Sequence, residues 1–247
     1  MLKTIVITDL TQMPTGDRVC VVGIDRQDYC IRLFWDDKGV LKRHLYIGDK
    51  LVIRPKAKIR CDFHSVPIQP PHIEDLGFDP NSIIDDGVCT DAEWERVLRS
   101  NLFSTVDDIY DGLLQEHRWV KPGAKTRSIG TLSPAYIAAV QLPMWSGKLK
   151  YRLSFRDNTG FSYDNIPISD LAFQEFSYAE VKRRNRSPVA VAQEITGLFG
   201  EVGPLYLRLG LARPWANPNT GKLCCYMQVT GIYTLPDYLG GKSFADF

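Results

Sequence analysis

Polar and apolar positions alternate along three consecutive segments in the second half of the chain. These segments cover residues 136–142, 149–155 and 161–168, and turn residues rich in Pro, Gly, Asp and Asn separate them at 143–147 and 157–160. Alternation with a period of two is the pattern of a strand with one buried face, and such residues mark turns. The pattern predicts three strands joined by two tight connections.

Helical spacing replaces the alternation after residue 168. Ser177 and Glu180 form a capping-box pattern, and Ser187 precedes a proline at the first position of a second helix. We therefore expect helices across residues 178–199, followed by a closing hairpin of strands at 205–211 and 223–233. Three strands, a helix and a hairpin are the element order of an OB-type barrel.

The first half of the chain is a looser version of the same order. Five segments can supply its strands: 4–8, 19–24, 29–35, 51–53 and 58–63. Between the halves, Thr90 with Glu93 caps one predicted helix, and Thr105 precedes another with a clean apolar stripe. The predicted fold is mainly β with α insertions. It has a first OB-like barrel at 1–73, an acidic helical bridging segment at 74–127 and a second OB-like barrel at 128–247.

The chain also contains an internal similarity. Residues 31–39 and 151–160 share Arg-Leu, an aromatic residue, Asp and a turn glycine in the same order. Both segments are typical of a strand that enters a hairpin turn. The match favours a duplicated supersecondary unit, because a duplication should repeat its neighbouring elements as well.

Four cations occupy every second position from residue 54 to residue 60: Arg54, Lys56, Lys58 and Arg60. In an extended strand this spacing places all four on one face. Such a cationic stripe can bind the phosphates of a nucleic acid. The alternative is a solvated strand, since lysine is also common on exposed sheet edges.

The closing hairpin offers a second candidate surface. Leucines share one face of its first strand, while Tyr206 and Arg208 share the other; Tyr226 and Gln228 follow on the second strand. Aromatic side chains beside cations hold single strands, and each stacked base contributes ~1–3 kcal/mol. In the alternative interpretation, the tyrosines pack on neighbouring helices and Arg208 meets a carboxylate.

Composition and charge limit the possible classes. The net charge is +1, which argues against a protein that coats nucleic acid by bulk charge. Segment 42–60 nevertheless carries seven cations and one anion, whereas segment 74–116 carries twelve carboxylates and two arginines. The cationic segments either converge into a one-sided groove or are solvated faces. Without a signal-peptide pattern or a long apolar run, we expect a cytoplasmic protein whose six cysteines are reduced.

Catalytic and metal-binding motifs are weak. The chain has no phosphate-loop, dinucleotide-binding or nucleophile-elbow pattern. The nearest zinc candidates are Cys61, His64, His72 and Cys89, but only the first two are closely spaced, which favours ordinary residues. Residues 72–75 (His-Ile-Glu-Asp) could form a general-base cluster, although a structural role is favoured because neighbours in a strand point to opposite faces. No cofactor and no metal are predicted.

Several motifs resemble those of the bacterial dual OB-containing domain family. Residues 205–215 (Leu-Tyr-Leu-Arg-Leu-Gly-Leu-Ala-Arg-Pro-Trp) and 226–239 are similar to its C-terminal signature, and residues 71–75 and 128–131 are similar to its internal motifs. The resemblance covers nearly the whole chain. It implies two OB-like modules and, by analogy of fold, nucleic-acid binding, but it carries over no catalytic residues.

The sequence therefore predicts a non-catalytic protein that binds DNA or RNA, with single-stranded or distorted nucleic acid favoured. The predicted contacts are Arg54, Lys56, Lys58, Arg60, Tyr206, Arg208, Tyr226 and Gln228. The main alternative is an adaptor that binds another protein in a larger nucleic-acid-processing or defence assembly. A hydrolase or nuclease whose carboxylates meet only in the fold ranks last.

Overall fold

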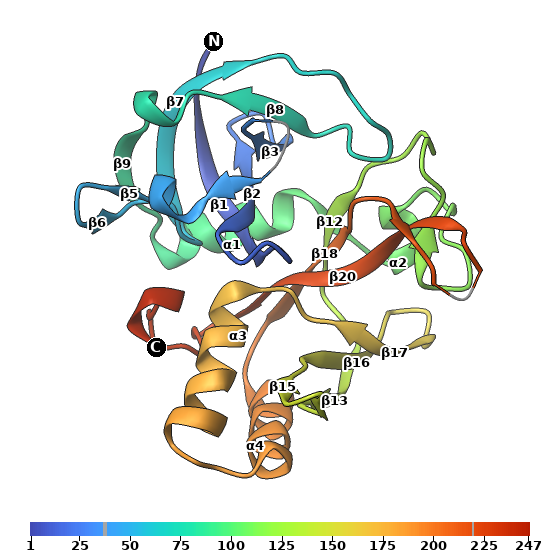
Figure 1. Ribbon diagram of the computed structural model, residues 1–247. Helices are drawn as coiled ribbons and strands as arrows, with labels where there is room; N and C mark the ends of the chain where they lie inside the picture. The colour runs from blue at the N-terminus through green and yellow to red at the C-terminus, as the bar shows by residue number, and fades with distance from the viewer. Residues whose placement is uncertain (37–38, 219) are drawn as a thin grey trace.

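The computed structural model describes residues 1–36, 39–218 and 220–247. The chain is mainly β with helical insertions, as the sequence predicts. Its N-terminal half forms an upper module and its C-terminal half a lower module, with the ends of β18 and β20 between them (Figure 1). Within the described ranges, no helix combines the length and the apolar character needed to span a bilayer.

The upper module is a closed barrel of five strands. These are β1 (Leu2–Gln12), β2 (Arg18–Asp25), β3 (Cys30–Phe34), β7 (Ala57–His64) and β8 (Asp75–Phe78). β1 pairs with β2, β2 with β3, β3 with β8 in parallel, β8 with β7, and β7 with β1. Numbered within the barrel, the strands follow the circuit 1-2-3-5-4.

The upper barrel extends beyond its predicted limit at residue 73. Its fifth strand is β8, which pairs with the end of β7, and β9 (Ile84–Val88) pairs with the first part of β7. Alternation could not identify β8 because it has only four residues, and both Gly77 and its neighbour Phe78 are buried. Among the described residues, the connection from β3 to β7 contains only short elements: β4 (Val40–Leu41), the 3-10 turn η1 (Lys42–Leu45), β5 (Tyr46–Ile47) and β6 (Lys50–Leu51).

The strand pairings of the lower module trace the same circuit. Its strands are β12 (Ile129–Leu132), β13 (Tyr136–Gln141), β16 (Arg152–Arg156), β17 (Ser162–Pro167), β18 (Leu205–Leu211) and β20 (Leu223–Thr234). β12 and β13 act as one bent first strand, because β12 pairs with β18 and β13 with β16. β16 then pairs with β17, Ile168 bridges to Val229 of β20 in parallel, and β20 pairs with β18.

The predicted helix caps are mostly confirmed. Thr90 and Glu93 form the capping box of α1 (Asp91–Ser100), and Ser187 caps α4 (Pro188–Glu201). Helix α2 (Val106–Ile109) begins after Thr105. Ser177 is not a cap, however, because α3 (Leu171–Tyr178) begins six residues earlier and continues into the π-turn η3 (Ala179–Arg183).

Asp170 caps α3 and also ties it to β20. Its carboxylate accepts hydrogen bonds from the backbone N–H groups of Ala172, Phe173 and Ile232. Burial raises the pKa of this carboxyl to about 7, although these three donors lower it. The cap is therefore a titrating group inside the fold.

We expect this carboxyl to make stability depend on pH. Its folded-state pKa lies above the unfolded value of about 3.9, so the folded state holds the proton more tightly and stability falls as the pH rises from about 4 to about 7. Between pH 6 and pH 8 the loss should be about 1.4 kcal/mol. Urea unfolding at both pH values should show this loss in the wild type and a smaller one in Asp170→Asn. Equal pH dependence in the two proteins would contradict the assignment.

The internal similarity does not align equivalent strands. Its first copy contains β3, the third strand of the upper barrel, whereas its second copy contains β16, the second strand of the lower circuit. Residues 37 and 38 of the first copy lie outside the described residues. The shared residues therefore mark two similar strand-and-turn segments that are not equivalent in the two modules. The evidence for a repeated strand order is the strand pairing in each module.

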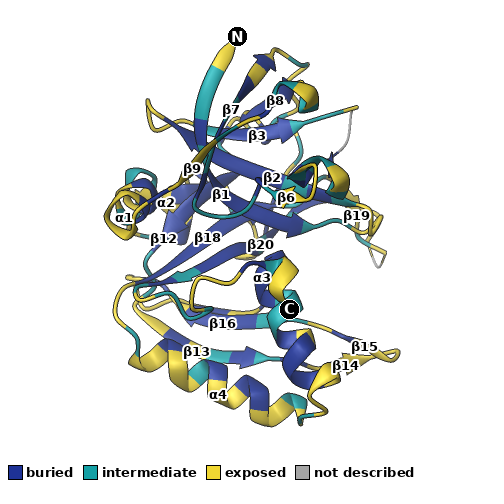
Figure 2. Ribbon diagram, turned by 90° about the vertical axis from the view of Figure 1, so that its left-hand side faces the viewer, coloured by how far each residue is buried: buried dark blue, intermediate teal, exposed yellow. Residues whose placement is uncertain are grey.

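The two modules are packed against each other. A shared apolar cluster joins Ile24 of β2 to Trp94, Val97 and Leu98 of α1 and to Tyr206 of β18. The strands at this junction, including β1, β2, β18 and β20, are buried along most of their length (Figure 2). The outer face of β2 and β3 in the upper barrel is consequently covered by the rest of the chain.

The remaining elements are short. They are η2 (Pro80–Ser82), β10 (Leu102–Phe103), β11 (Trp119–Val120), β14 (Met144–Trp145), β15 (Lys148–Leu149), β19 (Trp215–Ala216) and η4 (Phe244–Asp246).

Candidate nucleic-acid interface

The four cations of the stripe do not share a strand. β7 begins at Ala57, so only Lys58 and Arg60 lie on its outward face. Arg54 and Lys56 belong to the preceding turn, and Lys56 has a φ of 72°, in the left-handed region. The alternating pattern crosses a turn, and the prediction of one continuous charged face is wrong.

Carboxylates already neutralise most of the stripe. Lys56 Nζ lies 3.2 Å from Asp91, Lys58 Nζ lies 3.6 Å from Glu93, and an Arg60 Nη lies 3.3 Å from Asp86. The partners belong to α1 and β9, within the acidic bridging segment. The acidic segment therefore covers the cationic one, and the stripe contributes little unpaired charge to a binding surface.

Tyr206 and Arg208 are buried between the modules, which corrects the expectation that they face outward. Both faces of β18 are covered: the leucines fill the lower core and the opposite face meets β1 and α1. Arg208 Nε lies 3.0 Å from Asp9 and its Nη1 lies 2.9 Å from the Thr131 hydroxyl. The Tyr206 hydroxyl donates to Glu95 at 3.0 Å. The alternative interpretation is confirmed for both residues.

Tyr226 and Gln228 are half-buried on β20. The hydroxyl of Tyr226 accepts a hydrogen bond from Asn217 Nδ2 at 2.8 Å, and its ring meets Trp215 edge to face with 6.0 Å between centroids. Tyr226 pairs with Trp119 of β11, whereas the stripe contacts α1 and β9. The eight predicted contact residues thus do not form one surface.

The internal motifs that carry the family resemblance meet at the junction of the modules. Glu74 accepts hydrogen bonds from both the backbone N–H and the hydroxyl of Ser128, each at 2.7 Å. Arg32 lies 3.3 Å from Asp75 and donates to the Ser128 hydroxyl at 2.7 Å. All four side chains are buried, so these motifs bind the two modules to each other.

His72 belongs to the same junction. Its Nε2 donates to the Leu211 carbonyl at 3.1 Å. Burial, together with the positive charges of the nearby Arg32 and Arg213, lowers the pKa of His72 to about 3. The imidazole is neutral at physiological pH and has a structural role, as favoured above.

The four zinc candidates are not brought together. Cys61 lies in the upper core and Cys89 beside Trp94, whereas His64 is exposed. Within the described residues, no three His, Cys, Asp or Glu side chains are placed to hold a metal ion. All six cysteines are free thiols.

The lower module presents a different cationic face, which the sequence reasoning missed. Arg152, Ser154 and Arg156 alternate with the core residues Leu153 and Phe155 along β16. They therefore point outward, with Gln141 opposite Arg152 and the exposed Tyr136 opposite Arg156. We call the outer side of β13, β16 and β17 the lower face.

Arginine charges on the lower face are not balanced by ion pairs. Within the described part of the chain, Arg118, Arg152 and Arg156 have no carboxylate oxygen within 4.0 Å of their nitrogens. Arg118 instead donates to the backbone carbonyl of Asp164 on β17 at 3.2 Å. Burial lowers the pKa of Arg152, and repulsion from Arg118 lowers it further. These arginines contrast with the neutralised stripe.

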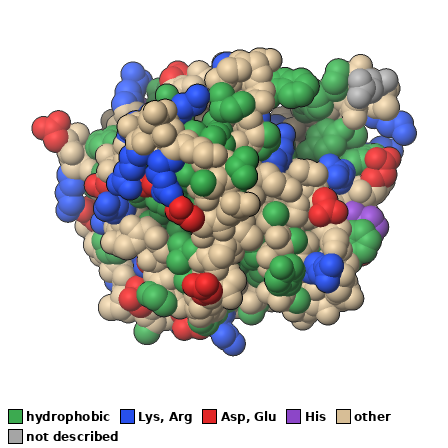
Figure 3. Space-filling model, turned by 90° about the horizontal axis from the view of Figure 1, so that it is seen from below, with side chains coloured by type: hydrophobic (Ala, Val, Ile, Leu, Met, Phe, Trp, Pro, Cys, Tyr) green, Lys and Arg blue, Asp and Glu red, His purple; other side chains and the backbone are tan. Residues whose placement is uncertain are grey.

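Two loops with exposed tryptophans flank this face. The β14–β15 hairpin carries Trp145, which is 72% exposed, and the loop that contains β19 carries Trp215, which is 55% exposed. Both loops project from the same side of the molecule (Figure 2). Seen from below, Lys and Arg side chains are mixed with hydrophobic ones, and their densest group lies on the left of the view (Figure 3).

A sequence signal for the first loop did exist. Trp145 lies between Pro143 and Gly147, inside a predicted turn, where a large aromatic side chain has no core to fill. The lower-face arginines gave a weaker signal, because Arg152 and Arg156 are only two outward positions of one predicted strand.

No family model matches the chain, and no curated protein or solved structure is found to be similar to it. Its function must therefore be inferred from its own geometry.

Proposed function

We propose that the protein binds single-stranded nucleic acid through the lower face and does not catalyse a reaction. The carrying observation is that Arg118, Arg152 and Arg156 lack carboxylate partners within the described residues and lie beside exposed aromatic side chains. Unpaired arginines can neutralise phosphates, and exposed aromatic rings can stack on unpaired bases. Together they match the chemistry of a single strand.

The strand circuit supports the same choice of face. We assign both modules to the OB type, whose ligands bind on the second and third strands and on the loops between strands 1 and 2 and between strands 4 and 5. In the lower module these elements are β16, β17, the β14–β15 hairpin and the β19 loop. In the upper barrel the corresponding face is covered by the rest of the chain, so we assign that barrel the structural role of stabilising the lower module.

Fluorescence anisotropy with labelled single-stranded oligonucleotides at several salt concentrations tests this proposal. For a single strand, the slope of the logarithm of the binding constant against the logarithm of the salt concentration changes by about 0.7 for each lost phosphate contact. Arg152→Ala combined with Arg156→Ala should therefore flatten this slope by about 1.4. Trp145→Ala should weaken binding by about 1–3 kcal/mol while leaving the slope nearly unchanged, because stacking releases no counterion. The two variants separate charge from stacking.

The stripe provides the matched control. Lys58→Ala combined with Arg60→Ala removes the same number of charges from ion-paired positions and should leave the salt slope unchanged. If this control flattens the slope and the lower-face variant does not, the stripe is the interface. If the wild type binds no oligonucleotide at low salt, the proposed function is wrong.

A protein-binding adaptor is the second candidate. Its supporting observation is the exposure of Met144, Trp145 and Leu223, which are 42%, 72% and 56% exposed. Methionine and aromatic residues are enriched in protein interfaces. A partner held by this surface should be lost in Trp145→Ala with little dependence on salt.

A further inference from the structure

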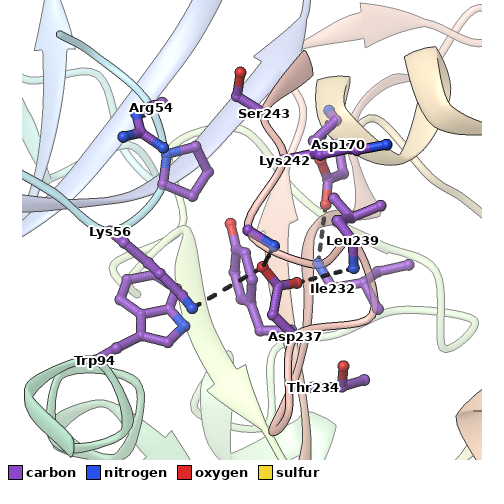
Figure 4. Close-up of a pocket in the computed structure, with 14 residues that line it drawn as sticks. Arg54, Lys56, Trp94, Asp170, Ile232, Thr234, Asp237, Leu239, Lys242 and Ser243 are labelled. Atoms are coloured by element: carbon purple, nitrogen blue, oxygen red, sulfur yellow. Dashed lines mark hydrogen bonds and ion pairs between the residues drawn. The ribbon is translucent and has the colours of Figure 1, made fainter. Parts of the chain in front are cut away.

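A pocket lies at the junction of the two modules, away from the lower face (Figure 4). One wall is the turn that contains Arg54, Pro55 and Lys56, and another is Trp94 of α1. The end of β20 and residues 237–243 close the remaining sides. Segments distant in sequence thus converge on one small hollow of about 50 Å³.

The indole of Trp94 leaves a donor unused in this pocket. Trp94 is fully buried and its ring meets Tyr233 edge to face, with 4.9 Å between centroids. Its Nε1 is a buried donor without a hydrogen-bond partner among the described residues. Figure 4 shows this nitrogen and the amino group of Lys56 on the same side of the pocket. A buried donor without a partner is costly, so an acceptor placed there would be stabilised.

Three cations line the pocket against two carboxyls, Asp170 and Asp237. Arg54, Lys56 and Lys242 line it, and Arg54 and Lys242 have no carboxylate within 4.0 Å among the described residues. The Asp237 carboxylate is occupied by the backbone N–H groups of Leu239 and Gly241, at 3.1 and 3.0 Å. The Nζ of Lys56 lies 3.2 Å from the exposed Asp91 and 4.0 Å from Asp237. The surplus favours an anion.

The pocket also has apolar walls. Pro55, Ala172, Ile232 and Leu239 line it together with the charged groups. A ligand that fills the hollow would therefore bury an apolar part against these residues while its charged end meets the donors.

We propose that this pocket binds a small organic anion, with a carboxylate or phosphate oxygen accepting hydrogen bonds from Trp94 Nε1 and Lys56 Nζ. The apolar body of the ligand packs against Pro55, Ile232 and Leu239. Because Lys56 lies in the turn before β7 and Trp94 lies in α1, the ligand bridges the upper barrel and the helix that packs against it. The proposal is independent of nucleic-acid binding at the lower face.

Indole N–H signals from protein labelled with ¹⁵N-tryptophan test the proposal. The chain has five tryptophans, and Trp94→Phe identifies the signal of Trp94. We would titrate the full chain with the small anions propionate, methyl phosphate and inorganic phosphate, with sodium chloride at matched ionic strength as the reference. The Trp94 signal should shift saturably with propionate or methyl phosphate, and the signals of Trp145 and Trp215 should not follow the same curve.

Two lysine variants complete the test. Lys56→Met retains the apolar stem but removes the charge, and it should weaken the responding anion roughly tenfold, as expected for loss of a charged hydrogen bond. Lys58→Met removes a neighbouring charge that does not line the pocket and should have no effect. Equal thermal midpoints show that both variants are folded.

Three outcomes would overturn the proposal. The first is the absence of a saturable Trp94 shift with either organic anion up to about 10 mM, a concentration at which a site with a millimolar dissociation constant would be mostly occupied. The second is a shift with inorganic phosphate alone, because it would exclude an organic ligand. The third is wild-type affinity in Lys56→Met. Propionate and methyl phosphate distinguish the carboxylate and the phosphate forms of the ligand.

Discussion

Replacing Arg208 by methionine is expected to lower the free energy of unfolding by about 3–5 kcal/mol, because the substitution leaves a buried carboxylate without its counter-charge. Arg208 is fully buried and its Nε lies 3.0 Å from Asp9, which is 1% exposed. The same guanidinium donates to Thr131 on β12. The loss should appear in urea unfolding as a lower midpoint with an unchanged slope.

The partner variant shows whether charge is responsible. Combining Arg208→Met with Asp9→Leu removes both charges, and this double variant should recover much of the lost stability. Arg96→Ala, at an exposed ion pair with Asp28, is the control and should change stability by less than about 1 kcal/mol. A loss below about 1 kcal/mol in Arg208→Met would contradict a buried ion pair. Folded Arg208→Met should still bind oligonucleotides like the wild type, because Arg208 is not on the surface.

Replacing Glu74 by alanine is expected to cost a similar amount, about 3–5 kcal/mol. Its carboxylate accepts two hydrogen bonds from Ser128, and one of its oxygens lies 3.9 Å from Arg32. The substitution leaves buried donors of the other module without acceptors and removes a counter-charge of a buried arginine. Because these contacts join the two modules, thermal unfolding should show a lower midpoint for the whole chain.

The neighbouring residue supplies the control. Ile73 is 47% exposed, so Ile73→Ala should change stability far less than Glu74→Ala. Comparable losses in the two variants would indicate that the backbone of this segment, rather than the Glu74 carboxylate, determines the effect. A separate early transition in Glu74→Ala would show that the modules unfold independently.

Local signals predicted the lower module well. Alternation identified β13, β16, β17, β18 and β20 but not β12, and Thr90, Thr105 and Ser187 marked three helix starts. The start of helix α3 was not predicted, because its cap, Asp170, is followed by apolar residues that also fit the end of a strand. The fifth strand of the upper barrel was not predicted, because four residues are too few to show alternation of polar and apolar positions.

Alternation gave the faces of the strands but not what covers them. For β18 it separated leucines from Tyr206 and Arg208 correctly, yet both faces proved to be buried. For residues 54–60 it suggested one strand face, whereas a turn interrupts the pattern and α1 and β9 supply carboxylates. A polar side chain on a strand can meet solvent, a ligand or another module, and the period is the same in each case.

Short-range sequence patterns were enough for the mainly β class, the approximate positions of most long strands and the starts of three helices. These features depend on residues near one another in the chain, and their spacing can be seen in the sequence. Long-range packing brings Arg208 to Asp9 and Glu74 to Ser128, and it leaves the lower-face arginines without a carboxylate partner among the described residues. Each of these outcomes depends on which distant segment packs over a side chain, and packing of distant segments leaves no local period in the sequence.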